Sequence, residues 1–157
     1  MTAEGFVPFF DGESVLLILG SFPSVMSRTE GFYYGNPQNR FWKTVCDYFG
    51  ECVPRNVDEK KDFLKRRKIA LWDMVISCEI VGSKDASIRK EQVADIPSLL
   101  NRSKIKTIFC NGNKSFELLE REFPALLKIT KKLPSTSPAN PRFKAEAWFE
   151  SLDGVFL

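Results

Sequence analysis

VLLILG, residues 15 to 20, is the stretch that decides the fold of this 157-residue chain. Two other short runs are almost as continuously hydrophobic, IALWDM at 69–74 and IKTIFC at 105–110. Such runs are typical of parallel strands that helices cover on both faces. A fourth run, LLKITKKL at 126–133, is more polar and predicts a strand nearer the edge of the sheet. The four runs together predict a mainly parallel, four-stranded central sheet.

Amphipathic stretches separate the predicted strands, and polar N-cap residues mark where helices should begin. The expected starts are Asn36 followed by Pro37, then Asp58, residue 91 (a short helix over 91–101), Asn113, and Asn140 followed by Pro141. Gly50 is expected to end the first of these helices. The order β-α-α-β-loop-α-β-α-β-α indicates an α/β fold with three layers, α/β/α, built as one domain over residues 1–157.

The composition favours a compact globular protein. Hydrophobic residues make up 43% of the chain and include 14 phenylalanines, enough to form a sizeable core. No apolar run approaches the roughly 18 residues of a membrane span. The N-terminal stretch MTAEGFVPFFDGES lacks the basic and apolar regions of a secretory signal. We therefore expect a monomer that stays in the cytosol and does not bind membranes.

The cysteine and histidine content narrows the chemistry. The four cysteines form no CxxC pair and the chain has no histidine, so we expect neither a metal nor a cofactor. Without histidine there is no Ser-His-Asp or Cys-His nucleophile arrangement. Catalysis would have to rest on carboxylates, amides, backbone groups or the substrate. The net charge of +3 permits a polyanionic partner without requiring one.

Four polar segments follow the predicted strands. They are GSFPS at 20–24, Asp73, Asn111-Gly112-Asn113, and PSTSPAN at 134–140. Ligands of open parallel sheets bind outside the carboxyl ends of the strands, where the connecting loops converge. We therefore expect all four segments to line one rim.

Asn39 stands in the first turn of the helix predicted from Pro37. It lies three residues before Trp42 and seven before Cys46, so it shares the inward stripe of that helix. Free backbone N–H groups and the positive end of the helix dipole favour the binding of an oxygen-rich ligand there. Two interpretations follow from spacing alone: Asn39 holds a water or substrate oxygen at the rim, or it only hydrogen-bonds a neighbouring loop.

Four segments spread over most of the chain carry a resemblance: LILGSFPS (17–24), YYGNPQNRFW (33–42), ALWDMVISCEIVGSKDASI (70–88) and LPSTSPAN (133–140). Together they resemble the uracil-DNA glycosylase superfamily, and within it they are most similar to the DNA-deoxyinosine (hypoxanthine-DNA) glycosylase branch. The first family motif is a Gly-rich turn at a strand end, and the second is a Pro-Ser-rich loop after the last strand. Mismatch-specific relatives carry an Asn in the first motif where Phe22 stands here. Asn39 is therefore the residue expected to position the attacking water.

The resemblance implies a base pocket at the rim, because a glycosylase flips its target nucleotide out of the duplex. The expected pocket residues are Gly20, Ser21, Phe22, Pro23, Tyr33, Tyr34, Asp73 and Asn111. Phe22 would stack on the flipped base and the two tyrosines would wall the pocket. Asp73 would accept a hydrogen bond from a ring N–H, or protonate the leaving base if burial raises its pKa. Core packing for Phe22 and capping for Asp73 are the structural alternatives.

The resemblance also implies a DNA-contacting surface beside the pocket. The expected contacts are Gly112, Ser135, Thr136, Ser137, Pro138, Ala139, Asn140 and Arg142. Their hydroxyl, amide and backbone groups suit phosphates, and Pro138 and Ala139 are candidates to enter the gap in the base stack. An ordinary turn followed by an N-cap is the structural alternative for this loop.

The implied function is a monofunctional DNA glycosylase that removes a deaminated base, hypoxanthine foremost, and leaves an abasic site. Monofunctional action is expected because no lysine stands in the rim segments to form a Schiff base. Two alternatives stay open. One is a uracil or mismatch-specific uracil glycosylase, and the other is a non-catalytic nucleic-acid-binding module.

Overall fold

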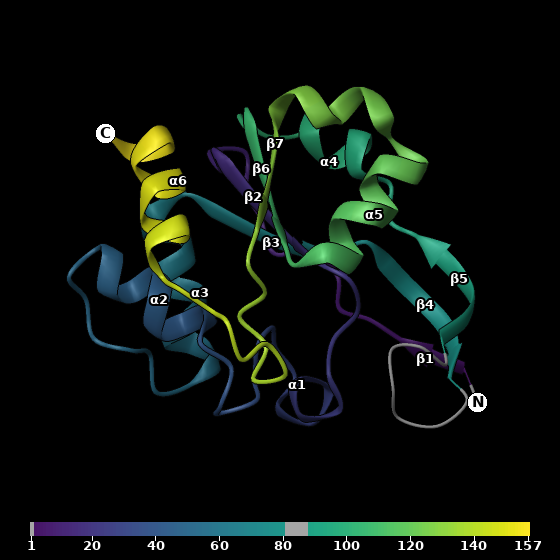
Figure 1. Cartoon of the computed structure of the whole chain (residues 1–157), viewed down its shortest axis with the longest axis horizontal. Coiled ribbons are helices and arrows are strands. Elements are labelled where there is room, and N and C mark those ends of the chain that lie inside the picture. Colours follow the sequence, from purple (N-terminus) through teal and green to yellow (C-terminus); the bar gives the residue numbers. More distant parts are fainter. Residues whose placement is uncertain (1, 81–87) are drawn as a thin grey trace.

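The computed structural model describes residues 2–80 and 88–157 and has a central sheet between two layers of helices (Figure 1). The sheet consists of four parallel strands: β2 (Leu16–Gly20), β3 (Ile69–Asp73), β6 (Thr107–Asn111) and β7 (Thr130–Leu133). Their order is β3-β2-β6-β7. The predicted α/β/α architecture with a four-stranded parallel sheet is confirmed. Residues 81–87, part of the segment 70–88 quoted above, lie outside the described residues.

Strand β2 lies between two hydrophobic cores, one on each face of the sheet. Its side chains alternate between the faces of the sheet, as the strand period requires. Leu16 and Ile18 belong to one core cluster and Leu17 and Leu19 to the other, and all four are fully buried. The continuous hydrophobicity of 15–20 therefore reflects burial on both faces.

Different helices cover the two faces (Figure 1). Helices α2 (Phe41–Tyr48), α3 (Val57–Arg67) and α6 (Glu146–Phe156) cover one face. The other face is covered by α4 (Ile96–Asn101), α5 (Asn113–Glu122) and the 3-10 helix η2 (Pro124–Ile129). None of the helices in residues 2–80 and 88–157 has the length and hydrophobicity of a membrane span.

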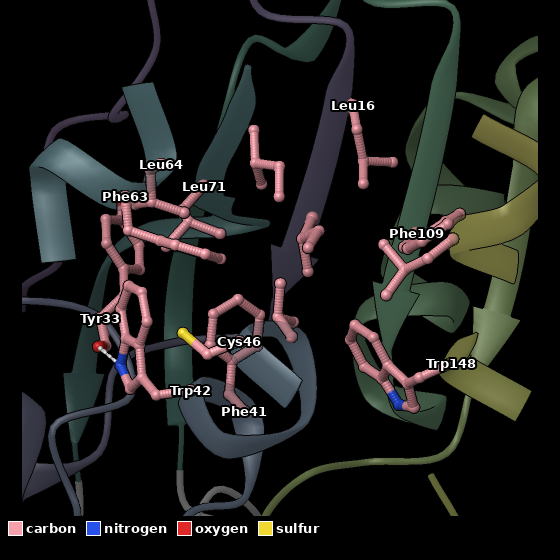
Figure 2. Packing of buried hydrophobic residues seen from close by; sticks show 14 of the residues in the cluster. Leu16, Tyr33, Phe41, Trp42, Cys46, Phe63, Leu64, Leu71, Phe109 and Trp148 are labelled. Carbon is pink, nitrogen blue, oxygen red and sulfur yellow. Dashed lines mark hydrogen bonds between the residues drawn. The ribbon is translucent and has the colours of Figure 1, made fainter. Parts of the chain in front are cut away.

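Aromatic rings dominate the first core, which Figure 2 shows from close by. The buried Trp148 ring meets Phe41 and Phe109 edge to face, each with centroids 6.1 Å apart. The Trp42 indole N–H donates to the Tyr33 carbonyl at 3.1 Å, so this core also fixes the main chain at Tyr33.

A second, antiparallel sheet was not predicted. Its strands are β1 (Thr2–Glu4), β4 (Val75–Ile80) and β5 (Ile88–Val93), in the order β1-β4-β5. The helix predicted over 91–101 is wrong in its first half, because residues up to Val93 pair with β4. Helix α4 begins only at Ile96, where Asp95 accepts a hydrogen bond from the Ser98 N–H at 3.2 Å.

Both Asn-Pro pairs were wrongly predicted to open helices. The Asn36 side chain instead accepts from the Gln38 N–H at 2.9 Å, and Asn140 accepts from the Arg142 N–H at 3.2 Å. These are short turns in which an Asn side chain bonds the backbone two residues on. The helices follow later, at Phe41 and Glu146.

Two other boundaries also differ from the prediction, and one short helix was missed. Asn56, not Asp58, caps α3 and accepts from the Glu59 N–H at 2.9 Å. The stretch 126–133 is strand only from Thr130, because η2 occupies the residues after Pro124. The short helix α1 (Val25–Glu30), which Ser24 caps, was not predicted.

The junction of β6 and α5 depends on Gly112. Its backbone has φ 96° and ψ 175°, a conformation that is essentially restricted to glycine. A Cβ at this position would also stand 3.0 Å from the Ser135 Cβ. Gly112 therefore lets the loop after β7 lie directly against the end of β6.

Gly112→Ala is expected to lower the free energy of unfolding by about 3 kcal/mol, the sum of backbone strain and overpacking. Gly31→Ala is the matched control: Gly31 also has positive φ, 90°, but apart from its chain neighbours no atom of the described residues lies within 4 Å of the point that a Cβ would occupy there. That variant should lose about 1 kcal/mol. Denaturant unfolding compares the two, and equal losses would show that the contact with Ser135 is not tight.

Candidate active site

The carboxyl ends of β2 and β6 form the crevice in which ligands of such sheets bind. The chain leaves β2 toward α2 and α3 on one face, and it leaves β6 toward α5 on the other. A cavity of about 160 Å³ opens at this point, where the strand order reverses. A cavity of about 150 Å³ can hold a benzene-sized ring, so this one has the scale of a small planar ligand.

The cavity brings together residues from segments far apart in the sequence. It is lined by Gly20, Ser21, Phe22, Pro23, Ser24, Ser27, Tyr33, Tyr34, Asn39, Asp73, Asn111, Ser135, Thr136 and Ser137. All eight residues predicted for the base pocket are among them, together with Asn39. Their chemical roles remain predictions, but their placement at one rim agrees with the expectation.

Most of the residues predicted to contact DNA line one or both of two neighbouring hollows. Ser135, Thr136 and Ser137 line the cavity itself. An adjoining hollow of about 450 Å³ is lined by Ser135 and Ser137 together with Gly112, Ala139 and Asn140, among others. Pro138 and Arg142 line neither hollow.

Gly20 ends β2 at the floor of the cavity. A Cβ there would stand well under 3.0 Å from the Asp73 Oδ1 and 3.3 Å from the Tyr34 Oη. The Gly20 carbonyl accepts from the Met74 N–H at 2.8 Å, which continues the pairing of the two strands past their ends. Only a residue without a side chain lets a carboxylate and a phenol approach this point together.

The two tyrosines have different environments. Tyr33 is almost fully buried, and its hydroxyl donates to the Val7 carbonyl at 2.9 Å. The Tyr34 ring stacks on Phe41, with centroids 4.2 Å apart and planes 19° from parallel. The Tyr34 hydroxyl oxygen is buried near the Asn111 amide, and no acceptor for its O–H stands in hydrogen-bond geometry among the described residues.

Burial raises the pKa of both phenols, and the negative charge of Asp73 raises each of them further. For Tyr34 the neighbouring Asn111 amide offsets a smaller part of this rise in pKa. Both tyrosines therefore keep their protons at neutral pH, and their hydroxyls are hydrogen-bond donors.

Asn39 lines the cavity and also bonds the chain at the start of α2. Its Oδ1 accepts from the Phe41 N–H at 2.9 Å, a turn in which an Asn side chain bonds the backbone two residues on. An amide oxygen has a second lone pair and the amide nitrogen carries two N–H groups. The Asn39 side chain is only partly buried, so these groups can still bind a water in the cavity. The Asn39 side chain thus has a local backbone partner, and its role in positioning water stays a prediction.

Arg40 fixes the loop after β7, and the sequence reasoning missed it. Its guanidinium donates to the carbonyl oxygens of Thr136 at 3.4 Å, Asn140 at 2.8 Å and Ser137. Its backbone N–H also donates to the Thr136 carbonyl, at 3.0 Å. The guanidinium carbon stands 4.5 Å from the centre of the Phe143 ring. No sequence signal could find this residue, because its partners are about a hundred residues away and are main-chain atoms.

Asn111 and Thr136 join the end of β6 to the same loop. The Asn111 side chain donates to the Thr136 hydroxyl and accepts from the Thr136 N–H, both at 2.9 Å. Thr136 is fully buried. These contacts give Thr136, predicted to contact DNA, a role in holding the loop from inside.

Ser24 and Ser27, also missed, connect α1 to the chain before α2. The Ser24 Oγ accepts from the Ser27 N–H at 3.1 Å, and the Ser27 Oγ accepts from the Gly35 N–H at 2.8 Å. A capping signal at Ser24 in GSFPS could have indicated α1. In the part of the chain that the structure describes, no group of three or more His, Cys, Asp or Glu side chains could hold a metal ion.

Comparison with known proteins identifies the family. The family model "Uracil DNA glycosylase superfamily" matches residues 7–152. A protein of Methanosarcina acetivorans named hypoxanthine DNA glycosylase is 38% identical over 149 residues, which cover 91% of each chain. Its namesake from Methanosarcina barkeri is 35% identical over 144 residues and 90% of each chain. The solution NMR structure of a Methanosarcina acetivorans protein, described as a candidate uracil DNA glycosylase, is 36% identical. It superposes with a TM-score of 0.83 over 97% of this chain and 96% of that one. The chain therefore belongs to the uracil DNA glycosylase superfamily.

Proposed function

We propose that this protein is a monofunctional DNA glycosylase of base excision repair. It hydrolyses the N-glycosidic bond of a deaminated base, hypoxanthine foremost, and leaves an abasic site in the DNA. The observation that carries this proposal is the cavity at the carboxyl ends of β2 and β6, which gathers Asn39, Asp73 and Tyr34 in a chain that belongs to this superfamily. The two relatives named hypoxanthine DNA glycosylase support the choice of base.

The cavity suits a base that has left the duplex. A glycosylase flips the target nucleotide into a pocket and reads its hydrogen-bonding edge. Here aromatic side chains form part of the wall and polar groups lie at the floor and rim. Phe22 offers its ring to the flipped base, and the Arg28 guanidinium carbon stands 5.5 Å from the centre of that ring.

Water is the nucleophile in this mechanism. Bond breaking separates an electron-poor sugar from an electron-rich base, so the site must stabilise charge on both fragments. Asn39 orients the water, which loses its proton only after it meets the oxocarbenium-like sugar. The described lining residues offer hydroxyls, amides, aromatic rings and one carboxylate, and none carries an amine that could form a Schiff base.

DNA contacts follow from the loop beside the cavity. Ser135, Ser137 and Asn140 lie at its surface next to the flipped base and can bind phosphates through hydroxyl, amide and backbone groups. Because one copy of the chain supplies the whole cavity lining, we propose that the protein acts as a monomer. The cytosolic location stays a prediction from the sequence.

Single-turnover cleavage of labelled duplexes that carry inosine, uracil or xanthine, followed by alkali, tests the activity. Inosine-containing DNA should give the abasic product fastest, with no product from undamaged DNA. Product from uracil alone would assign the protein to the uracil glycosylases instead. No product from any of the three would favour a non-catalytic nucleic-acid-binding module.

Asn39→Ala should slow the removal of hypoxanthine by about 100-fold or more, because one positioned group at the reacting centre contributes on the order of 3 kcal/mol. Affinity for the same duplex should stay within about threefold, since a water-orienting amide contributes little to DNA binding. Single-turnover kinetics and fluorescence anisotropy measure the two quantities separately.

Asn39→Ser controls for the turn at the start of α2. A serine hydroxyl can make the same kind of local bond to the backbone, though more weakly, so this variant should keep much of the melting temperature that Asn39→Ala loses. Its hydroxyl cannot replace both ends of the amide, and turnover should therefore remain slow. Full turnover by the serine variant would reduce Asn39 to its structural role.

Arg40→Ala should release the loop at 134–140 from the start of α2. Loss of the charged hydrogen bonds is expected to cost about 2 kcal/mol of stability and to weaken binding of inosine-containing DNA by about tenfold. Arg40→Lys keeps the charge but cannot span three carbonyl groups, so it should behave like the alanine variant. Wild-type affinity in the lysine variant would mean that charge alone matters at this position.

A further inference from the structure

The Tyr34 hydroxyl stands out at the floor of the cavity. Its oxygen is buried, and the Asn111 amide is near enough to lower the Tyr34 pKa, but no acceptor for the Tyr34 O–H stands in hydrogen-bond geometry among the described residues. Nearly all buried polar groups in proteins are hydrogen-bonded. The side chain cannot easily turn to find a partner. Its ring is stacked on Phe41 at 4.2 Å, and the Tyr34 backbone has φ 55°, which non-glycine residues rarely adopt. A strained residue that holds an unsatisfied donor in a cavity suggests a ligand atom as the missing acceptor.

The Asp73 carboxylate stands beside this hydroxyl. Both groups lie against Gly20, close to the position that a Cβ would take. The carboxylate comes from the end of β3, where Asp73 is buried. An ionised carboxylate only accepts hydrogen bonds, whereas the Tyr34 phenol, whose pKa is raised, remains a donor. The floor thus presents one donor and one acceptor side by side.

We propose that Tyr34 and Asp73 read the lactam edge of the flipped base, with the Tyr34 hydroxyl donating to the ring carbonyl and Asp73 accepting from the adjacent ring N–H. This makes Tyr34 a specificity-determining residue, and the inference rests on the proposed glycosylase function. Hypoxanthine presents this pattern at O6 and N1–H. Adenine, from which hypoxanthine arises by deamination, presents a bare N1 that the carboxylate would repel.

The same contact assists departure of the base. Negative charge grows on the base as the glycosidic bond breaks, and part of it reaches the ring carbonyl. The negative charge of Asp73 disfavours this growth of negative charge on the base. A hydrogen bond from a neutral donor to the carbonyl therefore stabilises the transition state more than the ground state. Guanine shares the lactam edge. The edge contact does not exclude guanine, whereas the cost of flipping a well-paired base disfavours it, because that cost is lowest for damaged or mismatched bases.

Tyr34→Phe tests the proposal because it keeps the ring and its stacking but removes the hydroxyl. The substrates are duplexes that carry either hypoxanthine or unsubstituted purine, which lacks both the carbonyl and the ring N–H. Single-turnover removal of hypoxanthine should slow by about tenfold or more, and removal of purine by less than about threefold. The corresponding 2′-fluoroarabino duplexes resist cleavage and therefore allow binding to be measured. Wild type should bind the hypoxanthine duplex more tightly than the purine duplex, and the variant should lose this preference.

Tyr33→Phe is the matched control. Its hydroxyl is already bonded to the Val7 carbonyl at 2.9 Å, so its removal should lower stability and change the rates on the two bases by the same factor. Equal effects of Tyr34→Phe on hypoxanthine and purine, or no effect on hypoxanthine, would overturn the role assigned to Tyr34. If the wild-type protein neither cleaves nor preferentially binds either damaged duplex, the proposed function itself fails and this inference falls with it.

Discussion

The missing side chain at Gly20 is the constraint on which the candidate site depends. Two neighbouring parallel strands end there, and the Asp73 carboxylate and the Tyr34 hydroxyl both lie close to the space that a Cβ would fill. The strands remain hydrogen-bonded past their ends, through the Met74 N–H and the Gly20 carbonyl. The Asp73 end of the polar floor is therefore attached directly to the sheet, which favours fixed dipoles that can assist a reaction.

The loop at 134–140, which is proposed to face DNA, is held mainly through its own backbone. Arg40 binds three of its carbonyl groups, and Asn111 binds the buried Thr136. The Trp148 indole N–H adds a bond of 2.9 Å to the Pro134 carbonyl. These contacts leave side chains of the loop on the outer surface, where the proposed function has them bind phosphates. A loop that is ordered in advance loses less entropy when DNA binds. Because Arg40 directly follows Asn39, the same turn of chain sets both the loop and the proposed water site.

Sequence patterns predicted the features that arise from local chemistry and from burial on both faces of a sheet. Strands such as 15–20 could be read directly, and the parallel arrangement then placed Asp73 and Asn111 at one rim. Pairing between distant segments could not be read, which explains why β1, β4 and β5 were missed and why the helix predicted from residue 91 begins too early. Asn36 and Asn140 misled because an Asn-Pro pair satisfies its hydrogen bonds equally well in a short turn as at a helix start. Arg40 left no trace in the sequence, since carbonyl partners carry no residue identity.

A chain without histidine lacks the side chain whose ordinary pKa lies nearest neutral pH, so groups whose protonation does not change there become candidates for catalysis. The two cavity tyrosines fit this description, since burial and the charge of Asp73 raise their pKa values. The Asn39 amide does not titrate at all. A neutral hydrogen-bond donor stabilises charge only when it points at the reacting atom, so its side chain must be held in that orientation. The stacking of Tyr34 on Phe41 and the bond from the Phe41 N–H to Asn39 meet this requirement from a single residue of α2. Phe41 thereby connects the buried aromatic core to both groups that the proposed reaction needs.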